Sequence, residues 1–397
     1  MFKTKEAKNA ALIGSMCAVA YMITYFGRNM LSAVSPQMIE EGVFDTAYIG
    51  TLSSLFFICY AIGQLLNGMI GDKIRANYMI SFGLILAGIC SFCFSKFTDF
   101  PQLICVLYGI MGFFLSMIFA PMVKITAENT SEVHATRCCL GYDFGSLLGA
   151  PLAGAVAVIL AWKQVMWFGS AALILMGVIC LLGFAGMERK GIVKYNRYER
   201  TKEKGSGSIK VLIEHDIIRF TLIAIVTGVI RTTVVFWIPT YLAQYLGFSA
   251  DMSAGIYTVV TLLISVSSFL SVFIYERLGN NMNLTILIGF VVSTIAFVGT
   301  YLVHQRWVNI VLLVIAIVFE QCVSAMIWNR YCPGLRDTGR VSSATGVLDF
   351  CSYMAASVSS SLFANSVEQI GWGNLILIWA GVMFLGILIA IPYKKRK

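Results

Sequence analysis

Residues 165–186 read VMWFGSAALILMGVICLLGFAG and contain no charged side chain. A helix needs about 20 apolar residues to cross the hydrocarbon core of a bilayer, so this stretch is long enough to span a membrane. Similar stretches recur on both sides of it, separated by short polar segments. The pattern predicts twelve spans, at residues 9–34, 46–71, 77–96, 101–125, 136–160, 165–186, 216–243, 250–275, 282–303, 306–330, 341–366 and 372–392.

The composition of the 397-residue chain supports a membrane protein. Only 12% of its residues are charged and 58% are hydrophobic, whereas a soluble domain has about 25% charged residues. The net charge is +9, and in so apolar a chain this excess favours contact with a lipid surface over contact with nucleic acid. We expect an all-α polytopic membrane protein whose partners include the bilayer but no nucleic acid.

The distribution of loop charges predicts the orientation. With twelve spans, most lysines and arginines fall on the side that holds both termini, and the opposite side holds only Lys96, Lys163 and Arg306. Basic loops remain in the cytoplasm. We therefore expect a multi-pass protein of the cytoplasmic (inner) membrane with both termini in the cytoplasm.

Related motifs recur in the two halves of the chain. Arg28 and Arg231 lie 203 residues apart, and each precedes a proline by eight positions. Asp143 and Asp349 are separated by a similar distance, 206 residues. The repetition predicts two pseudo-symmetric bundles of six helices, 1–186 and 216–397, with a polar cytoplasmic linker at 187–215. Transporters built this way bind substrate between the halves.

Two arginines inside the spans point to an anionic substrate. Arg28 and Arg231 lie on the first and seventh predicted helices, at equivalent repeat positions. A charge inside a membrane is costly and usually faces the protein interior. A guanidinium presents a planar fork that matches phosphate or carboxylate, so both arginines are candidate substrate ligands. Pairing with an acid, which would only pin the helices together, is the structural alternative.

Other polar residues are weaker candidates for the same site. Tyr21 and Tyr25 precede Arg28 on roughly the same helical face, where they fit anion binding or plain packing. Gln64 in the second span is a candidate of the same kind. Lys124 lies nearer a helix end.

Three acids inside the spans, Asp143, Asp349 and Glu320, allow several interpretations. They could form salt bridges with Arg28, Arg231 or Lys124. They could carry protons, because burial favours the neutral form of a carboxyl group. They could also bind a cationic part of the substrate. The sequence leaves all three readings open.

Nothing in the sequence indicates an enzyme. The three histidines lie at predicted helix ends or in loops, and no phosphate-binding glycine loop or metal-ligand cluster is present in the sequence. Cys90-x-x-Cys93 has no second such pair, so small apolar packing is the expected role of the cysteines. We expect no cofactor and no metal.

The loop after the second span carries a family motif. Residues 68–75, GMIGDKIR, resemble the cytoplasmic loop between helices two and three of the major facilitator superfamily. In that family the loop forms a charge network that gates the closed state. The resemblance assigns this gating role to Gly68, Asp72, Lys73 and Arg75, and it implies a twelve-helix fold and a monomer.

Within that superfamily, the chain resembles the organophosphate:phosphate antiporters over nearly its whole length. The motifs are YMITYFGRN at 21–29, Arg231 with WIPTYL at 237–242, ATG at 344–346 through Tyr353 to 358, and GWG at 371–373. The resemblance implies that Arg28 and Arg231 are the two arginines that bind phosphate in that family. It also implies that Tyr21 and Tyr25 line the substrate cavity. Lys124 falls near a basic residue of helix four in that family.

These features predict a secondary active transporter that moves a phosphorylated sugar or other organophosphate by alternating access, in exchange for inorganic phosphate. Asn29 and Gln64 stand where the glycerol-phosphate branch has lysines, so glycerol 3-phosphate fits less well. Residues 27–32, GRNMLS, also resemble proton-coupled carboxylate and hexuronate symporters, although these generally lack an arginine like Arg231. A sugar-phosphate membrane sensor is a further alternative.

Overall fold

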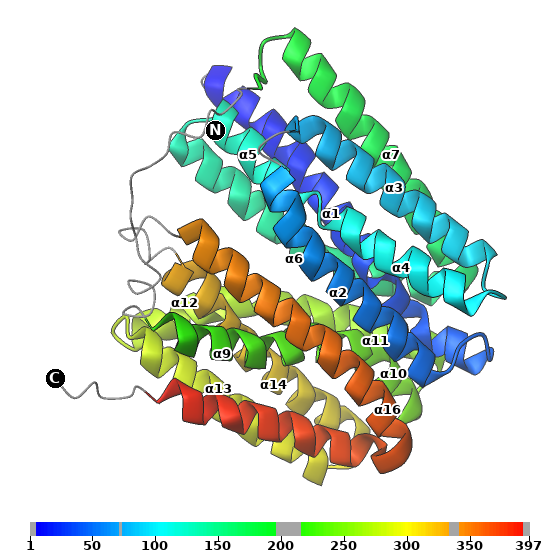
Figure 1. Cartoon of the computed structure of the whole chain (residues 1–397). Helices are drawn as coiled ribbons and strands as arrows, with labels where there is room; N and C mark the ends of the chain where they lie inside the picture. Colours follow the sequence, from blue (N-terminus) through cyan, green and yellow to red (C-terminus); the bar gives the residue numbers. More distant parts are fainter. Residues whose placement is uncertain (1–4, 71–73, 196–215, 333–340, 392–397) are drawn as a thin grey trace. The chain divides into compact units, whose positions relative to one another are not determined.

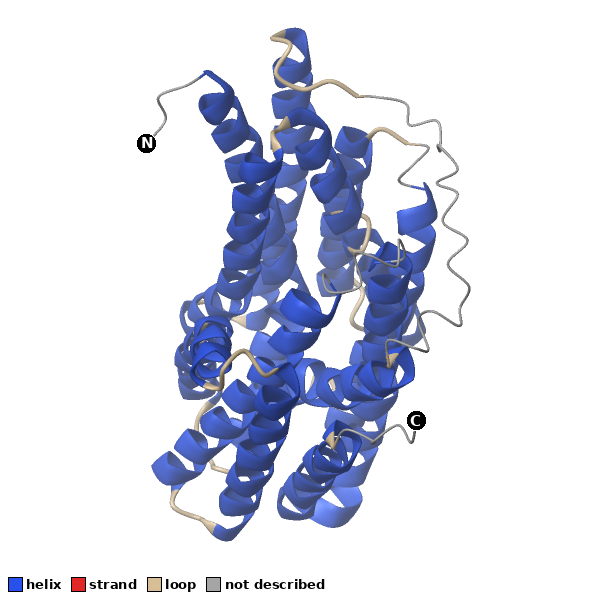
Figure 2. Cartoon of the chain, turned by 90° about the vertical axis from the view of Figure 1, so that its left-hand side faces the viewer, coloured by secondary structure: helices blue, strands red, loops and turns tan. Residues whose placement is uncertain are grey.

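The structure is a computed structural model that describes residues 5–70, 74–195, 216–332 and 341–391. Within these ranges the secondary structure is helical, without strands (Figure 2). The chain divides into two compact units, which Figure 1 shows coloured along the sequence. Unit 1 contains Met1–Asp45, Leu55–Lys202 and Phe248–Thr261, and unit 2 contains Thr46–Ser54, Glu203–Gly247 and Leu262–Lys397. Most of the predicted linker, residues 196–215, lies outside the described residues.

The helices of the N-terminal half follow the predicted spans closely. They are α1 (Lys5–Glu40), α2 (Thr46–Ile70), α3 (Ala76–Lys96), α4 (Pro101–Leu115), α5 (Phe119–Asn129), α6 (Glu132–Ile159) and α7 (Trp162–Arg189). The predicted fourth span is covered by α4 and α5 together, with a short interruption between them.

The C-terminal half contains more interruptions. Its elements are α9 (Ile217–Gly228), η1 (Val229–Val234), α10 (Val235–Gln244), α11 (Ala250–Ser265), α12 (Ser267–Arg277), α13 (Met282–Leu302), α14 (Arg306–Met326), η2 (Ile327–Tyr331) and α16 (Val341–Ala390). The last helix covers two predicted spans, and Gly371 breaks it with φ 75° and ψ 165°. This left-handed φ suits glycine, which has no side chain to clash there.

Ten helical stretches among the described residues are long and apolar enough to cross a membrane. One of them, Ala344–Ala390, contains 47 residues and includes the break at Gly371, and a shorter apolar helix covers Phe144–Ile159. The predicted count of twelve fits this arrangement.

Helix pairings in unit 1 recur in unit 2. In unit 1, α1 packs on α6 and α3 packs on α7. In unit 2, α9 packs on the N-terminal part of the chain segment that forms α16, and α13 also packs on α16. The pairings match the repeat read from the arginine and aspartate spacings.

Glycines allow the first of these pairs to approach closely. A Cβ added at Gly145 of α6 would lie 2.5 Å from the carbonyl oxygen of Ala18, and one at Gly149 would lie 2.3 Å from the Cβ of Tyr25. Such distances leave no room for a side chain, so small residues let α6 pack against the backbone of α1.

The outer surfaces of the helices are apolar. Leu175 and Leu182 of α7 are 62% and 67% exposed, and many other large apolar side chains are similarly exposed. A soluble monomer rarely exposes apolar patches of that extent. This surface suits lipid, as the opening stretch of sequence predicts.

Candidate functional site

Arg28 lies half-buried on α1 among aromatic rings of unit 1. Its guanidinium carbon is 5.0 Å from the centre of the Tyr60 ring, 5.4 Å from that of Tyr25 and 5.8 Å from that of Phe57. A cation within about 6 Å of an aromatic face is attracted by the ring's quadrupole. These rings hold the arginine without contributing a full negative charge.

Neighbouring groups fix Tyr25 in this arrangement. Gly149 of α6 gives the Tyr25 Cβ its room, and the Asn29 side-chain amide donates a 2.7 Å hydrogen bond to the Tyr25 carbonyl oxygen. The Tyr257 hydroxyl donates to Asn29 Oδ1 at 3.4 Å, so α11 also contributes to the surroundings of Arg28 in unit 1. No motif in the sequence indicates this contribution.

The other predicted site residues of the N-terminal half differ in how far their side chains are buried. Tyr21 is 7% exposed, and its ring centroid is 4.9 Å from that of Tyr25 in an edge-to-face contact. Gln64 is half-buried on α2, one turn after Tyr60 on the same helical face.

Lys124 is half-buried on α5 and lies one turn before Glu128, which is near the cytoplasmic end predicted for this helix. Burial raises the pKa of Glu128, and the positive charge of Lys124 lowers it in part. One Glu128 carboxylate oxygen, Oε1, is buried without a hydrogen-bond partner among the described residues. The lysine therefore has a nearby acid within its own helix.

Arg231 of unit 2 lies on a π-helical segment, η1. Its guanidinium carbon is 5.6 Å from the ring centre of Trp328 and 5.8 Å from that of Tyr353. Its Nη2 donates a 3.4 Å hydrogen bond to Ser352 Oγ. Trp328 lies on the second π-helical segment, η2. Short π-helical segments often occur at functional positions, where they redirect a side chain.

A close backbone contact fixes this second arginine cluster. A Cβ added at Gly228 would lie 2.4 Å from the carbonyl oxygen of Ser352, so the glycine lets α9 approach α16 beside Arg231. Thr233 Oγ1, two residues after Arg231, donates to the carbonyl oxygen of Ala356 at 2.9 Å. These two contacts hold α9 and η1 against α16, the helix that carries Ser352 and Tyr353.

The three predicted acids differ in their surroundings. Glu320 on α14 is 0% exposed, and neither carboxylate oxygen has a hydrogen-bond partner in the described part of the chain. The Arg231 guanidinium interacts with it electrostatically. Asp349 is half-buried on α16, one turn before Ser352 and Tyr353. Asp143 lies on α6, and its side chain is outside the described residues.

The predicted gating loop is only partly described. Gly68 lies in the last turn of α2, and Asp72 and Lys73 lie outside the described residues. Arg75 Nη1 is 3.3 Å from Glu188 Oε1 at the end of α7, and its guanidinium carbon is 5.5 Å from the ring centre of Tyr195. Both side chains of this pair are well exposed, so the ion pair contributes at most about 1 kcal/mol.

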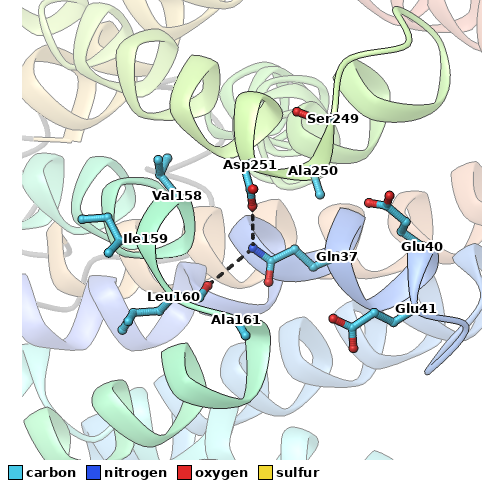
Figure 3. A pocket seen from close by; sticks show the side chains of 10 residues that line it. All are labelled: Gln37, Glu40, Glu41, Val158, Ile159, Leu160, Ala161, Ser249, Ala250 and Asp251. Atoms are coloured by element: carbon cyan, nitrogen blue, oxygen red, sulfur yellow. Dashed lines mark hydrogen bonds between the residues drawn. The ribbon is translucent and has the colours of Figure 1, made fainter.

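A pocket of about 520 Å³ in unit 1 lies between the end of α1, the α6–α7 connection and the start of α11 (Figure 3). Glu40, Glu41 and Asp251 line it. The Gln37 side-chain amide donates to the Ala157 carbonyl oxygen at 2.9 Å, and at 3.5 Å to Asp251 Oδ1. Three carboxylates repel an anion, so this pocket is distinct in character from the arginine clusters.

Sequence reasoning found both arginines but missed most of their partners. Phe57, Tyr60 and Trp328 sit inside apolar runs, where an aromatic residue is ordinarily a packing residue. Helical spacing gives no signal for their role, because each contact joins different helices. Tyr353 lies within a family motif, but its contact with Arg231 appears only in three dimensions.

Comparisons with known proteins agree with this architecture. A probable hexose phosphate transport protein of Chlamydia trachomatis is 21% identical, over 94% of this chain and 88% of that protein. A hexuronate transporter of Bacillus subtilis is also 21% identical, over 95% of this chain and 93% of its own length.

Solved structures show the same fold. The crystal structure of a mutant of the nucleoside transporter NupG matches with a TM-score of 0.74 and 15% identity, over 96% of this chain and 99% of that one. The family model described as Major Facilitator Superfamily matches residues 17–360. With arginines inside spans, a repeated helix-pairing scheme and this match over most of its length, the chain belongs to the major facilitator superfamily of transporters.

Proposed function

We propose that this transporter moves a small organic anion, a phosphorylated sugar or another organophosphate, in exchange for inorganic phosphate. The observation that carries the proposal is the pair Arg28 and Arg231. They occupy equivalent repeat positions, and in each unit aromatic rings fix the guanidinium. The relative from Chlamydia, named for hexose phosphate transport, supports the same class of substrate.

In the proposed cycle both arginines contact the anion. A guanidinium can give two parallel hydrogen bonds to a phosphate group, and these bonds are stronger when the acceptor is charged. A carrier that returns without an anion loses these hydrogen bonds at both guanidiniums. A second anion removes that penalty, which favours exchange over one-way transport.

The remaining site and topology assignments belong to the same proposal. Tyr21, Tyr25, Gln64 and Lys124 are proposed to complete the substrate site, with Asp72, Lys73 and Arg75 acting in the cytoplasmic gate. The two six-helix domains are assigned to 1–186 and 216–397, joined by 187–215. Both termini are assigned to the cytoplasmic side of the inner membrane, and the transporter is assigned as a monomer.

Proteoliposomes loaded with inorganic phosphate test this proposal. We expect labelled glucose 6-phosphate to enter phosphate-loaded vesicles much faster than unloaded vesicles. Arg28→Ala and Arg231→Ala should abolish this uptake, whereas Arg277→Ala, on the exposed end of α12, should leave it unchanged. Uptake of neither phosphorylated sugars nor phosphate by the wild type would refute the proposal, and binding without translocation would indicate a sensor.

A proton-coupled hexuronate symporter is the second candidate. The relative from Bacillus subtilis, named a hexuronate transporter, supports it, and so does the segment at 27–32. A carboxylate fits the same arginine fork. Uptake of glucuronate driven by a proton gradient, with no acceleration by internal phosphate, would favour this candidate.

A further inference from the structure

We propose that Glu320 is a proton-binding site linked to the anion site at Arg231, so that an anion binding there takes up one proton from the medium. The inference deepens the proposed function, since it depends on an anion binding at Arg231. It adds a second transported species and assigns it to a named carboxyl group.

The first observation is the isolation of Glu320. Its side chain is 0% exposed, and neither carboxylate oxygen has a hydrogen-bond partner among the residues the structure describes. An ionised carboxylate in such surroundings is strongly unfavourable unless a cation compensates it. The group therefore has two acceptable conditions: a neutral acid, or a carboxylate balanced by a nearby positive charge.

The second observation identifies that positive charge. The helix that carries Glu320 packs on η1, the segment of Arg231, and the guanidinium interacts electrostatically with the carboxyl group. The residue one helical turn after Glu320 also lies beside a ring that contacts Arg231. Ser324 follows Glu320 by one helical turn and accepts a 3.2 Å hydrogen bond from Trp328 Nε1, and the Trp328 ring faces Arg231.

The other charged groups on elements packed against α14 are held elsewhere. Arg219 of α9 donates to the carbonyl oxygens of Ile389 and Ala390 and to Asn283 Oδ1. Arg277 of α12 lies over the Phe273 ring, and Arg330 of η2 lies over the Tyr275 ring.

The remaining titratable groups on those elements are Glu276 on α12, Tyr301 on α13, Tyr331 on η2, and Arg306 and Cys322 on α14 itself. Glu276 is exposed at the end of its helix, and Arg306 is exposed at the first residue of α14. Among the described residues on these elements, Arg231 is therefore the cation placed to compensate a Glu320 carboxylate.

The linkage follows from charge balance. While Arg231 faces no substrate, its positive charge compensates the ionised Glu320. When an anion binds to Arg231, the anion takes over that compensation and adds its own repulsion, so Glu320 takes up a proton. Release of the anion reverses both steps, and the same proton leaves.

The acid is present in one half of the repeat only. The repeat offsets of 203 and 206 place the counterpart of Glu320 within residues 114–117, which read FLSM and contain no acid. A buried charge present in one half alone is best explained by function, because intramembrane ionisable groups are otherwise rare.

Proton counting on the purified, detergent-solubilised transporter tests the proposal. Glucose 6-phosphate is added to wild type, Glu320→Gln and Glu368→Gln in weakly buffered solution with a pH indicator. Glu368 is an exposed acid of the same unit, so its variant is the matched control. The ligand's own protons are common to all three proteins and cancel in the difference.

We expect wild type and Glu368→Gln to take up close to one proton per bound anion more than Glu320→Gln does. Over the pH range in which Glu320 is ionised without the anion and protonated with it, wild-type affinity for the anion should fall about tenfold for each unit of rising pH, relative to the glutamine variant. Equal proton uptake by wild type and Glu320→Gln, with the anion bound in both, would overturn the proposal and leave the proposed function intact.

A second measurement requires no variant. In infrared difference spectra of the wild type, anion binding should produce a new protonated-carboxyl C=O band that shifts in D2O. If Glu320→Gln does not fold, the absence of this band still overturns the proposal. If glucose 6-phosphate, phosphate and glucuronate all fail to bind the wild type, the proposed function fails and the proton linkage falls with it.

Discussion

Replacing Arg231 with lysine tests whether the anion is held by a fork or only by a charge. Lysine keeps the positive charge and can still face the rings of Trp328 and Tyr353, which lie 5.6 and 5.8 Å from the guanidinium carbon. It cannot present two parallel N–H groups in a fixed plane. The substitution therefore removes one hydrogen bond to the anion and leaves most other interactions in place.

The magnitude follows from that single lost contact. A hydrogen bond to a charged group contributes about 1.5–3 kcal/mol, which corresponds to a loss of about 10-fold to 150-fold in affinity. The hydrogen bond from Nη2 to Ser352 Oγ is long, at 3.4 Å, so its loss adds little. We expect Arg231→Lys to weaken binding of glucose 6-phosphate within this range.

Isothermal titration of detergent-purified protein measures the affinity directly. Arg277→Lys is the control, because Arg277 is exposed at the end of α12 in the same unit and lies over the ring of Phe273. The thermal stability of both variants should match that of the wild type. If the correctly inserted Arg231→Lys protein binds the anion as tightly as the wild type, a two-bond contact from this arginine is ruled out.

Three further substitutions test the surroundings of the site. Gly228→Ala puts a Cβ 2.4 Å from the Ser352 carbonyl oxygen, so we expect a loss of about 1–3 kcal/mol of stability in thermal unfolding, whereas Gly381→Ala, which meets no atom within 4 Å, should have little effect. Trp328→Leu removes a ring that helps to orient the Arg231 guanidinium, so anion affinity measured by titration should fall by up to about 2 kcal/mol, the upper bound set by the strength of the lost cation–π contact. Burial raises the pKa of Glu128, so the folded state binds its proton more tightly than the unfolded state and stability falls as pH rises above the ordinary value of about 4.3. Glu128→Gln should therefore raise the melting temperature at neutral pH and lose this advantage near pH 4, and a pH-independent difference would contradict the assignment.

The sequence predicts the spans well because the requirement is simple. A run of about 20 apolar residues is needed wherever a helix crosses lipid, and the observed helices begin and end within a few residues of the predicted ones. Gly145 and Gly149 lie one turn apart in the sequence, and small residues at this spacing form a stripe that favours close helix packing, as their contact with α1 illustrates. Both features depend on residues that are close together in the sequence.

The site was less predictable because its contacts join distant segments. Arg28 and Arg231 stand out as charges in apolar runs, but nothing near them in sequence identifies Tyr60 or Trp328 as partners. The π-helical segment at Arg231 was also missed, since its residues suit an α-helix equally well. The sequence places Glu320 inside a span, but its missing hydrogen bonds can be recognised only from the packed structure.

The rings around Arg28 have a consequence for the entropy of binding. A free arginine side chain carries about 2 kcal/mol of rotamer entropy, which a ligand must overcome when it immobilises the group. The rings of Tyr25, Phe57 and Tyr60 restrict the guanidinium before any ligand arrives. Binding then loses less entropy, and the orientation of the fork is set in advance. A preorganised arginine of this kind selects anions by the geometry of their oxygens, because it cannot reorient to fit a poorly matched one.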